Sequence, residues 1–189
     1  MKNLTLITGG ARSGKSKLAE QLALESGLPV VYLATMEVWT NDKEGVDRVR
    51  RHKQRRPENW TTLEVPVDVP EAVNALAYGP SIVILDCLSV FVSNLLLVRY
   101  EDGQDPYLYE GDIASAVDKL LSTISDHPEK KFIVVTNEVG FGVVPETVLG
   151  RAYRDFLGHA NQWVAQIADD VRLMCSGLQV KLKQPKRDK

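Results

Sequence analysis

The chain has 189 residues, 44% hydrophobic and 25% charged, which is the balance of a globular protein that can bury one core. Its 23 lysines and arginines nearly balance 25 acidic residues, and the net charge of -2 excludes the global basic field of a dedicated nucleic-acid binder. Cys87 and Cys175 lack the spacing of a zinc site or disulfide framework, and the longest apolar stretch, residues 81–98, is interrupted by polar side chains. We therefore expect a cytoplasmic protein with two buried thiols, no membrane span and no nucleic-acid partner.

Short runs of β-branched residues alternate with segments of helical spacing, the pattern of a mostly parallel α/β sheet. The first helix is expected to begin near Lys15, to direct Leu18, Leu22 and Leu24 inward and to end at Gly27. The expected strands are residues 4–8, 30–34, 82–87, 132–136 and 171–175, and the other helices are residues 70–77, 88–98, 113–124 and about 147–167. Ser176-Gly177 then predicts an antiparallel edge hairpin with residues 178–182. One domain over residues 1–182 is expected, followed by a basic, disordered tail, 183–189.

The strongest motif follows the first strand and opens the first helix. Gly9-Gly10-Ala11-Arg12-Ser13-Gly14-Lys15-Ser16 fits the P-loop pattern GxxxxGK[ST]. Glycines let backbone N–H groups wrap around phosphates, Lys15 reaches the outer phosphates and Ser16 can ligate Mg²⁺. The motif predicts a nucleoside triphosphate site.

Two further strand ends carry polar groups. Asp86 ends an apolar run and could hold the metal of the triphosphate, although an Asp in this place is also a common helix cap. Thr136-Asn137-Glu138 ends another strand and could either lie beside the transferred phosphate or form a structural turn before Gly140. The Asn-Lys-x-Asp motif that reads guanine in signalling GTPases is missing from the sequence.

A basic segment lies between the second and third expected strands. Residues 48–56 contain six arginines and lysines together with His52. Such a run is often only a solvated helix face. In a phosphate-binding domain, however, neighbouring cations keep an imidazole neutral and nucleophilic, and His52 could attack an α-phosphate, release pyrophosphate and carry the nucleotide to a second phosphate. His127, in a polar loop, and His159, four residues after Asp155 on a helix, are weaker candidates.

Taken together, these residues resemble the bifunctional adenosylcobinamide kinase and adenosylcobinamide-phosphate guanylyltransferase family of cobalamin biosynthesis. The likeness extends over nearly the whole chain. It is carried by residues 8–16, by His52-Lys53 before Arg56-Pro57, by residues 136–140 with 144–146, and by Arg154, Asp155, Gly158, Asn161 and Gln162.

The resemblance implies two reactions. A triphosphate, ATP or GTP, phosphorylates the aminopropanol hydroxyl of adenosylcobinamide, and GMP from GTP then caps that phosphate through a guanylylated His52. Lys15 is the second catalytic residue, and Ser16 and Asp86 are the ligands of Mg²⁺. The implied nucleotide contacts are Gly9, Gly10, Ala11, Arg12, Ser13, Gly14, Lys15, Ser16, Leu33, Ala34, Thr35, Lys53, Gln54, Arg55, Arg56, Glu64 and Asp86. A RecA-like P-loop fold assembled as a homotrimer is also implied.

Two other functions remain compatible with the residues. A single-activity P-loop kinase would use the basic segment only to steer phosphates, and its His52 would form no covalent adduct. A nucleotide-dependent binding module would instead use triphosphate hydrolysis to drive a conformational switch and would depend on a macromolecular partner.

Overall fold

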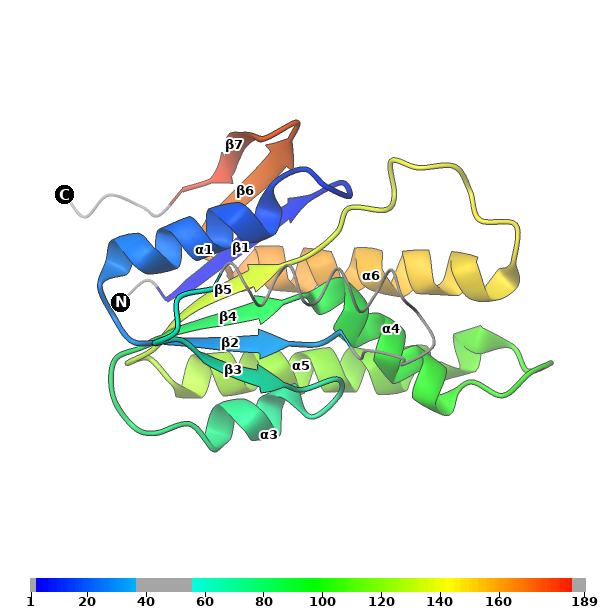
Figure 1. Cartoon of the computed structure of the whole chain (residues 1–189). Helices are drawn as coiled ribbons and strands as arrows, with labels where there is room; N and C mark the ends of the chain where they lie inside the picture. Colours follow the sequence, from blue (N-terminus) through cyan, green and yellow to red (C-terminus); the bar gives the residue numbers. More distant parts are fainter. Residues whose placement is uncertain (1–2, 37–55, 185–189) are drawn as a thin grey trace.

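A computed structural model of the chain describes residues 3–36 and 56–184, and its strands form one twisted sheet (Figure 1). The strand order is β3-β2-β4-β5-β1-β6-β7. The strands are β1 (Leu4–Gly9), β2 (Val30–Ala34), β3 (Thr61–Glu64), β4 (Ile82–Asp86), β5 (Lys131–Val135), β6 (Asp170–Cys175) and β7 (Leu178–Lys183). Neighbouring strands are parallel except for the β6–β7 pair, which is antiparallel. The expected α/β sheet with an antiparallel edge hairpin is confirmed.

Helices cover both faces of this sheet (Figure 1). The helices are α1 (Lys15–Ser26), α3 (Val69–Asn74), α4 (Leu88–Arg99), the 3₁₀ helix η1 (Pro106–Tyr109), α5 (Glu110–Asp126) and α6 (Val148–Ile167). Helix α1 packs on one face through Leu18, Ala19 and Ala23. Helices α3, α4, α5 and α6 pack on the other face and enclose the larger core. Strands β4 and β5 are buried on both faces, which explains their continuous apolar sequences.

Helix α1 ends where the glycine signal predicted. Gly27 adopts φ 67°, and its N–H donates to the carbonyl of Leu24 at 3.3 Å. The expected inward direction of Leu24 is wrong, because its side chain is 57% exposed and Ala23 is buried at 1% exposure. Small alanines face the sheet here, which lets α1 lie close to the strands.

Other expectations require correction. Strand β3 and the 3₁₀ helix η1 were not predicted from the sequence, and β7 extends one residue beyond the predicted strand, to Lys183. Cys175, expected to be buried, is exposed at the end of β6, whereas Cys87 is partly buried. Within residues 3–36 and 56–184, no helix combines the length and apolarity that a membrane crossing requires.

Candidate active site

The loop between β1 and α1 has the geometry of a phosphate cradle. Gly9 adopts φ 149° and Gly14 adopts φ 101°, backbone conformations that residues with a Cβ rarely adopt. A Cβ on Gly9 would lie 2.3 Å from the carbonyl oxygen of Met174, so only glycine allows β1 to pass so close to β6. The hairpin between β6 and β7 also supports the loop, because the Gly177 N–H donates to the Ser13 carbonyl at 3.0 Å.

Lys15 lies inside this loop rather than in solvent. Its side chain is buried at 7% exposure, and Nζ donates to the carbonyl oxygen of Gly10 at 2.7 Å. Burial lowers the pKa of Lys15, and the nearby Cys87 and Asp86 oppose that shift. Asp86 therefore lies close enough for its charge to act on the ammonium group, although 71 positions of sequence separate the two residues.

Two hydroxyl groups of the loop region are buried without a hydrogen-bond partner among the described residues. They are Thr8 Oγ1, near the end of β1, and Ser13 Oγ, within the loop. Unpaired buried hydroxyls are costly, and they are typical of a site that a polar ligand completes. The loop is therefore suited to a phosphate group.

The residues present also fit a magnesium ion. Mg²⁺ commonly takes one or two protein oxygens and completes its shell with phosphates and water. Ser16, in the first turn of α1, and Asp86, at the end of β4, supply a hydroxyl and a carboxylate of this kind. In the described part of the chain, no cluster of three or more His, Cys, Asp or Glu side chains forms a protein-only metal cage.

Three of the expected nucleotide residues are aligned across the ends of neighbouring strands. Ala34 of β2 pairs in register with Glu64 of β3 on one side and with Asp86 of β4 on the other. The side chains of Leu33 and Thr35, by contrast, are fully buried. The Thr35 hydroxyl donates to the Cys87 carbonyl at 2.9 Å and accepts from the Cys87 N–H at 2.8 Å, so it links β2 to β4 and does not reach the surface.

Arg56 lies beside this row, above an aromatic ring that the sequence analysis did not single out. The guanidinium carbon is 3.5 Å from the centre of the Tyr32 ring, and the Tyr32 hydroxyl donates to Asp86 Oδ2. Next to Arg56 lies an open depression of about 600 Å³. It is lined by Arg56, Pro57, Glu58, Trp60, Thr62, Leu63 and Glu64. Tyr32 and Trp60 gave no sequence signal, because both resemble ordinary core aromatics.

Side-chain hydrogen bonds join the segment that follows β5 to helices α4 and α6. Asn137 donates to Ser89 Oγ at 3.1 Å, Asn161 donates to the Asn137 carbonyl at 3.1 Å, and Thr136 donates to Asn161 Oδ1 at 2.7 Å. Glu138 accepts from the Gly140 N–H at 2.8 Å, which is the structural turn that the sequence left open. The network fixes the floor of the site beside the P-loop.

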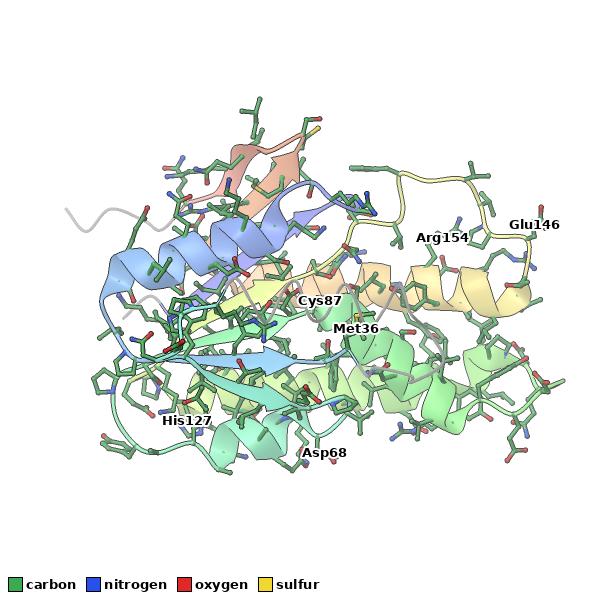
Figure 2. All side chains as sticks on the ribbon, viewed as in Figure 1. Met36, Asp68, Cys87, His127, Glu146 and Arg154 are labelled. Atoms are coloured by element: carbon green, nitrogen blue, oxygen red, sulfur yellow. The ribbon has the colours of Figure 1, made fainter. Side chains whose placement is uncertain are left out.

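Cys87 belongs to the same edge of the sheet (Figure 2). Its Sγ lies 2.9 Å from Ser89 Oγ. Burial, followed by the charge of Asp86, raises the pKa of Cys87 to about 11, so the thiol is neutral at physiological pH. We assign it no nucleophilic role.

Of the three histidines, His127 and His159 lie in the described part of the chain. His52, with Lys53, Gln54 and Arg55, lies outside the described residues. His127 is at the opposite edge of the sheet, where it contacts Asn74 and Glu129 (Figure 2). His159 Nδ1 lies 3.2 Å from Glu110 Oε1, so its acidic neighbour is Glu110 rather than Asp155, the partner suggested by helical spacing.

Comparison with known proteins agrees with this geometry. A family model described as cobinamide kinase / cobinamide phosphate guanyltransferase matches residues 5–182. The bifunctional adenosylcobalamin biosynthesis protein CobU of Escherichia coli is 39% identical over 95% of this chain and 99% of its own length. The corresponding protein CobP of Pseudomonas aeruginosa is 39% identical over 94% of this chain and 96% of its own.

Solved structures of lower similarity identify the fold. A RadB recombinase aligns with a TM-score of 0.51 at 14% identity, covering 99% of this chain and 83% of that chain. A type III secretion ATPase of pathogenic bacteria aligns with a TM-score of 0.57 at 10% identity, covering 96% of this chain and 58% of that chain. The RecA-like P-loop fold is thereby confirmed. From these sequence matches, the chain belongs to the cobinamide kinase / cobinamide phosphate guanyltransferase family.

Proposed function

We propose that this chain phosphorylates adenosylcobinamide with ATP or GTP and then transfers GMP from GTP to the new phosphate. The observation that carries the proposal is the buried Lys15 beside Asp86 in a P-loop, within a chain that matches the family over residues 5–182. The first reaction forms a bond between the acceptor hydroxyl oxygen and the γ-phosphorus, releasing a nucleoside diphosphate and the hydroxyl proton.

In the kinase reaction, backbone N–H groups of residues 9–16 hold the phosphates. Lys15 exchanges its bond to the Gly10 carbonyl for a phosphate oxygen and neutralises charge that develops during transfer. Ser16 and Asp86 would hold Mg²⁺, which would supply charge stabilisation for the phosphates. Burial lowers the pKa of Lys15, but the charge of the neighbouring Asp86 raises it and so favours the ammonium form.

In the guanylyl reaction, His52 attacks the α-phosphorus of GTP and pyrophosphate leaves. The phosphate of adenosylcobinamide phosphate then displaces the histidine and accepts GMP, so the enzyme is regenerated. Lys53, Gln54, Arg55, Arg56 and Glu64 are proposed to hold the guanosine. The depression lined by Arg56, Trp60 and Glu64 supports this assignment, since it combines a cation, an aromatic face and a carboxylate at the sheet edge.

We also propose where the enzyme works and how its subunits assemble. We place it in the cytoplasm, where free thiols such as Cys87 and Cys175 persist, and we propose a homotrimer. Exposed Leu178, Val180 and Leu182 alternate along β7 and give that edge strand an apolar face, which favours self-association. Sedimentation equilibrium tests the trimer, and a monomer at assay concentrations would contradict it.

The first test is removal of the Lys15 ammonium group. In Lys15→Ala, we expect adenosylcobinamide phosphorylation to fall at least about 100-fold, because the main cation at the transferred phosphate is lost. Phosphorylation is measured with radiolabelled ATP, and guanylyl transfer with labelled GTP. Lys17→Ala is the matched control, since Lys17 is exposed two positions along α1.

The outcomes separate the candidate functions. Normal phosphorylation by folded Lys15→Ala protein would contradict the assigned role of the P-loop. Phosphorylation without any guanylyl transfer by the native protein would favour the single-activity kinase.

A further inference from the structure

Arg56, Tyr32 and Asp86 form a continuous stack that joins the two halves of the proposed site. Arg56 is the last member of the basic run and lines the depression proposed for guanosine. Asp86 ends β4 near Lys15 of the P-loop. Tyr32, one residue before the buried Leu33 in β2, contacts both of them.

The hydroxyl group of Tyr32 fixes the carboxylate. Tyr32 is 1% exposed, so its O–H needs a protein partner, and Asp86 Oδ2 accepts the bond. A hydrogen bond to a carboxylate is stronger than one between neutral groups, and it restricts the rotation of the Asp86 side chain. Because each carboxylate oxygen has two lone pairs, Asp86 can accept from Tyr32 and still ligate a cation.

The ring of Tyr32 fixes the guanidinium group from the other side. Arg56 lies over the ring at 3.5 Å, and its Nη1 donates to Thr62 Oγ1 of β3 at 3.3 Å. A cation above an aromatic face is attracted by the negative charge of that face. The ring is itself held by Trp60, stacked at a centroid separation of 6.5 Å. The direction of Arg56 therefore depends on a side chain that also determines the direction of Asp86.

We propose that Tyr32 is a positioning residue for both reactions, which orients Asp86 toward the metal and phosphates and Arg56 toward the guanosine. This inference rests on the proposed function and extends it, because Tyr32 contacts the two side chains whose roles belong to different steps. A tyrosine needed only for core packing would use its ring alone, and phenylalanine would replace it without a change in metal dependence.

Tyr32→Phe tests the hydroxyl group while it keeps the ring. We measure binding of a non-hydrolysable ATP analogue by calorimetry over a range of Mg²⁺ concentrations, together with circular dichroism and the melting temperature. The Mg²⁺ concentration for half-saturation should rise about tenfold, which corresponds to one hydrogen bond to a charged group. Tyr107→Phe is the matched control, since it removes a 2.8 Å hydroxyl–carboxylate bond, to Asp155, away from the P-loop. It should leave the Mg²⁺ dependence unchanged.

A double-mutant cycle tests whether the hydroxyl acts through Asp86. In the Asp86→Asn background, Tyr32→Phe should add less than a twofold change in Mg²⁺ dependence. Arg56→Lys tests the other side of the ring, because lysine keeps the charge but not the planar group. It should weaken GTP binding severalfold more than ATP binding, at an unchanged melting temperature.

Two results would overturn the inference. One is a Tyr32→Phe protein with a lower melting temperature but native Mg²⁺ dependence, which would show packing only. The other is additive effects of Tyr32→Phe and Asp86→Asn. These binding measurements use no acceptor, so a native protein that fails to phosphorylate adenosylcobinamide would refute the proposed function independently.

Discussion

Two buried lysines at opposite ends of the parallel strands show how the surroundings of a side chain decide its role. Lys15 Nζ donates to the Gly10 carbonyl, and Asp86 lies close enough for its charge to favour the ammonium form. Lys130 Nζ donates to the carbonyls of Ala77 and Gly79 at 2.8 and 3.1 Å. Lys15 is therefore available to a ligand, whereas Lys130 holds the segment between α3 and β4 against β5.

We predict that Lys130→Ala lowers the free energy of unfolding by about 2–4 kcal/mol, because two carbonyls lose their donor. Urea unfolding followed by circular dichroism measures this loss. Lys131→Ala is the control, since Lys131 is exposed one position later in β5. An unchanged unfolding midpoint in Lys130→Ala would contradict the structural role.

Local sequence predicted only part of the site at the residue scale. Lys15 and Asp86 were found because a motif and a strand end mark them. The Tyr32–Asp86 bond joins residues 54 positions apart, and it depends on β2 and β4 being neighbours in the sheet. Helical periodicity placed Leu24 inward. Close packing of α1 on the sheet favours a small residue instead, and Ala23 occupies the buried position.

At the scale of elements, the P-loop depends on the edge hairpin as well as on its own glycines. Gly177 at the hairpin turn donates to Ser13, and Met174 of β6 leaves no room for a side chain at Gly9. The hairpin that the sequence predicted only as an edge feature is therefore a support for the phosphate loop.

Replacing Gly9 with alanine should separate β1 from β6 locally. In Gly9→Ala, the added Cβ would meet Met174 O at 2.3 Å, and φ would have to leave 149°. We expect the melting temperature to fall by several degrees and ATP binding to weaken at least tenfold. Differential scanning calorimetry and isothermal titration measure the two effects.

Gly10→Ala provides the comparison for stability, because nothing lies within 4 Å of a Cβ built on Gly10. A Gly9→Ala protein as stable as Gly10→Ala would contradict the close approach of the two strands.

Strand β3 was not predicted from the sequence, for a physical reason. Thr61–Glu64 is four residues long and partly exposed, so it lacks the apolar run that marks a buried strand. It forms because β2 offers a free edge with which to pair, from Val31–Thr61 to Ala34–Glu64. The local sequence pattern does not reveal that pairing. The pairing nevertheless brings Glu64 to the carboxyl ends of the strands, where Asp86 also lies.

At the scale of the whole molecule, the sheet collects functional groups from distant parts of the chain. Parallel strands end at one edge, so β1 contributes the P-loop, β3 contributes Glu64 and β4 contributes Asp86. Open α/β sheets bind ligands outside these carboxyl ends. The sequence predicted this edge as the site, because the fold class alone determines it, but the links among Asn137, Ser89 and Asn161 required the packing of α4 and α6.

The proposed function requires one chain to carry both a P-loop and a nucleotide-accepting histidine. The most direct test is intact-mass spectrometry after incubation with GTP and Mg²⁺, followed by peptide mapping, with His52→Ala as the control. We predict a GMP-sized adduct on the peptide containing His52, labile in acid and stable in base as a phosphoramidate is. Protein that binds GTP but acquires no adduct, or an adduct that persists in His52→Ala, would contradict the claim.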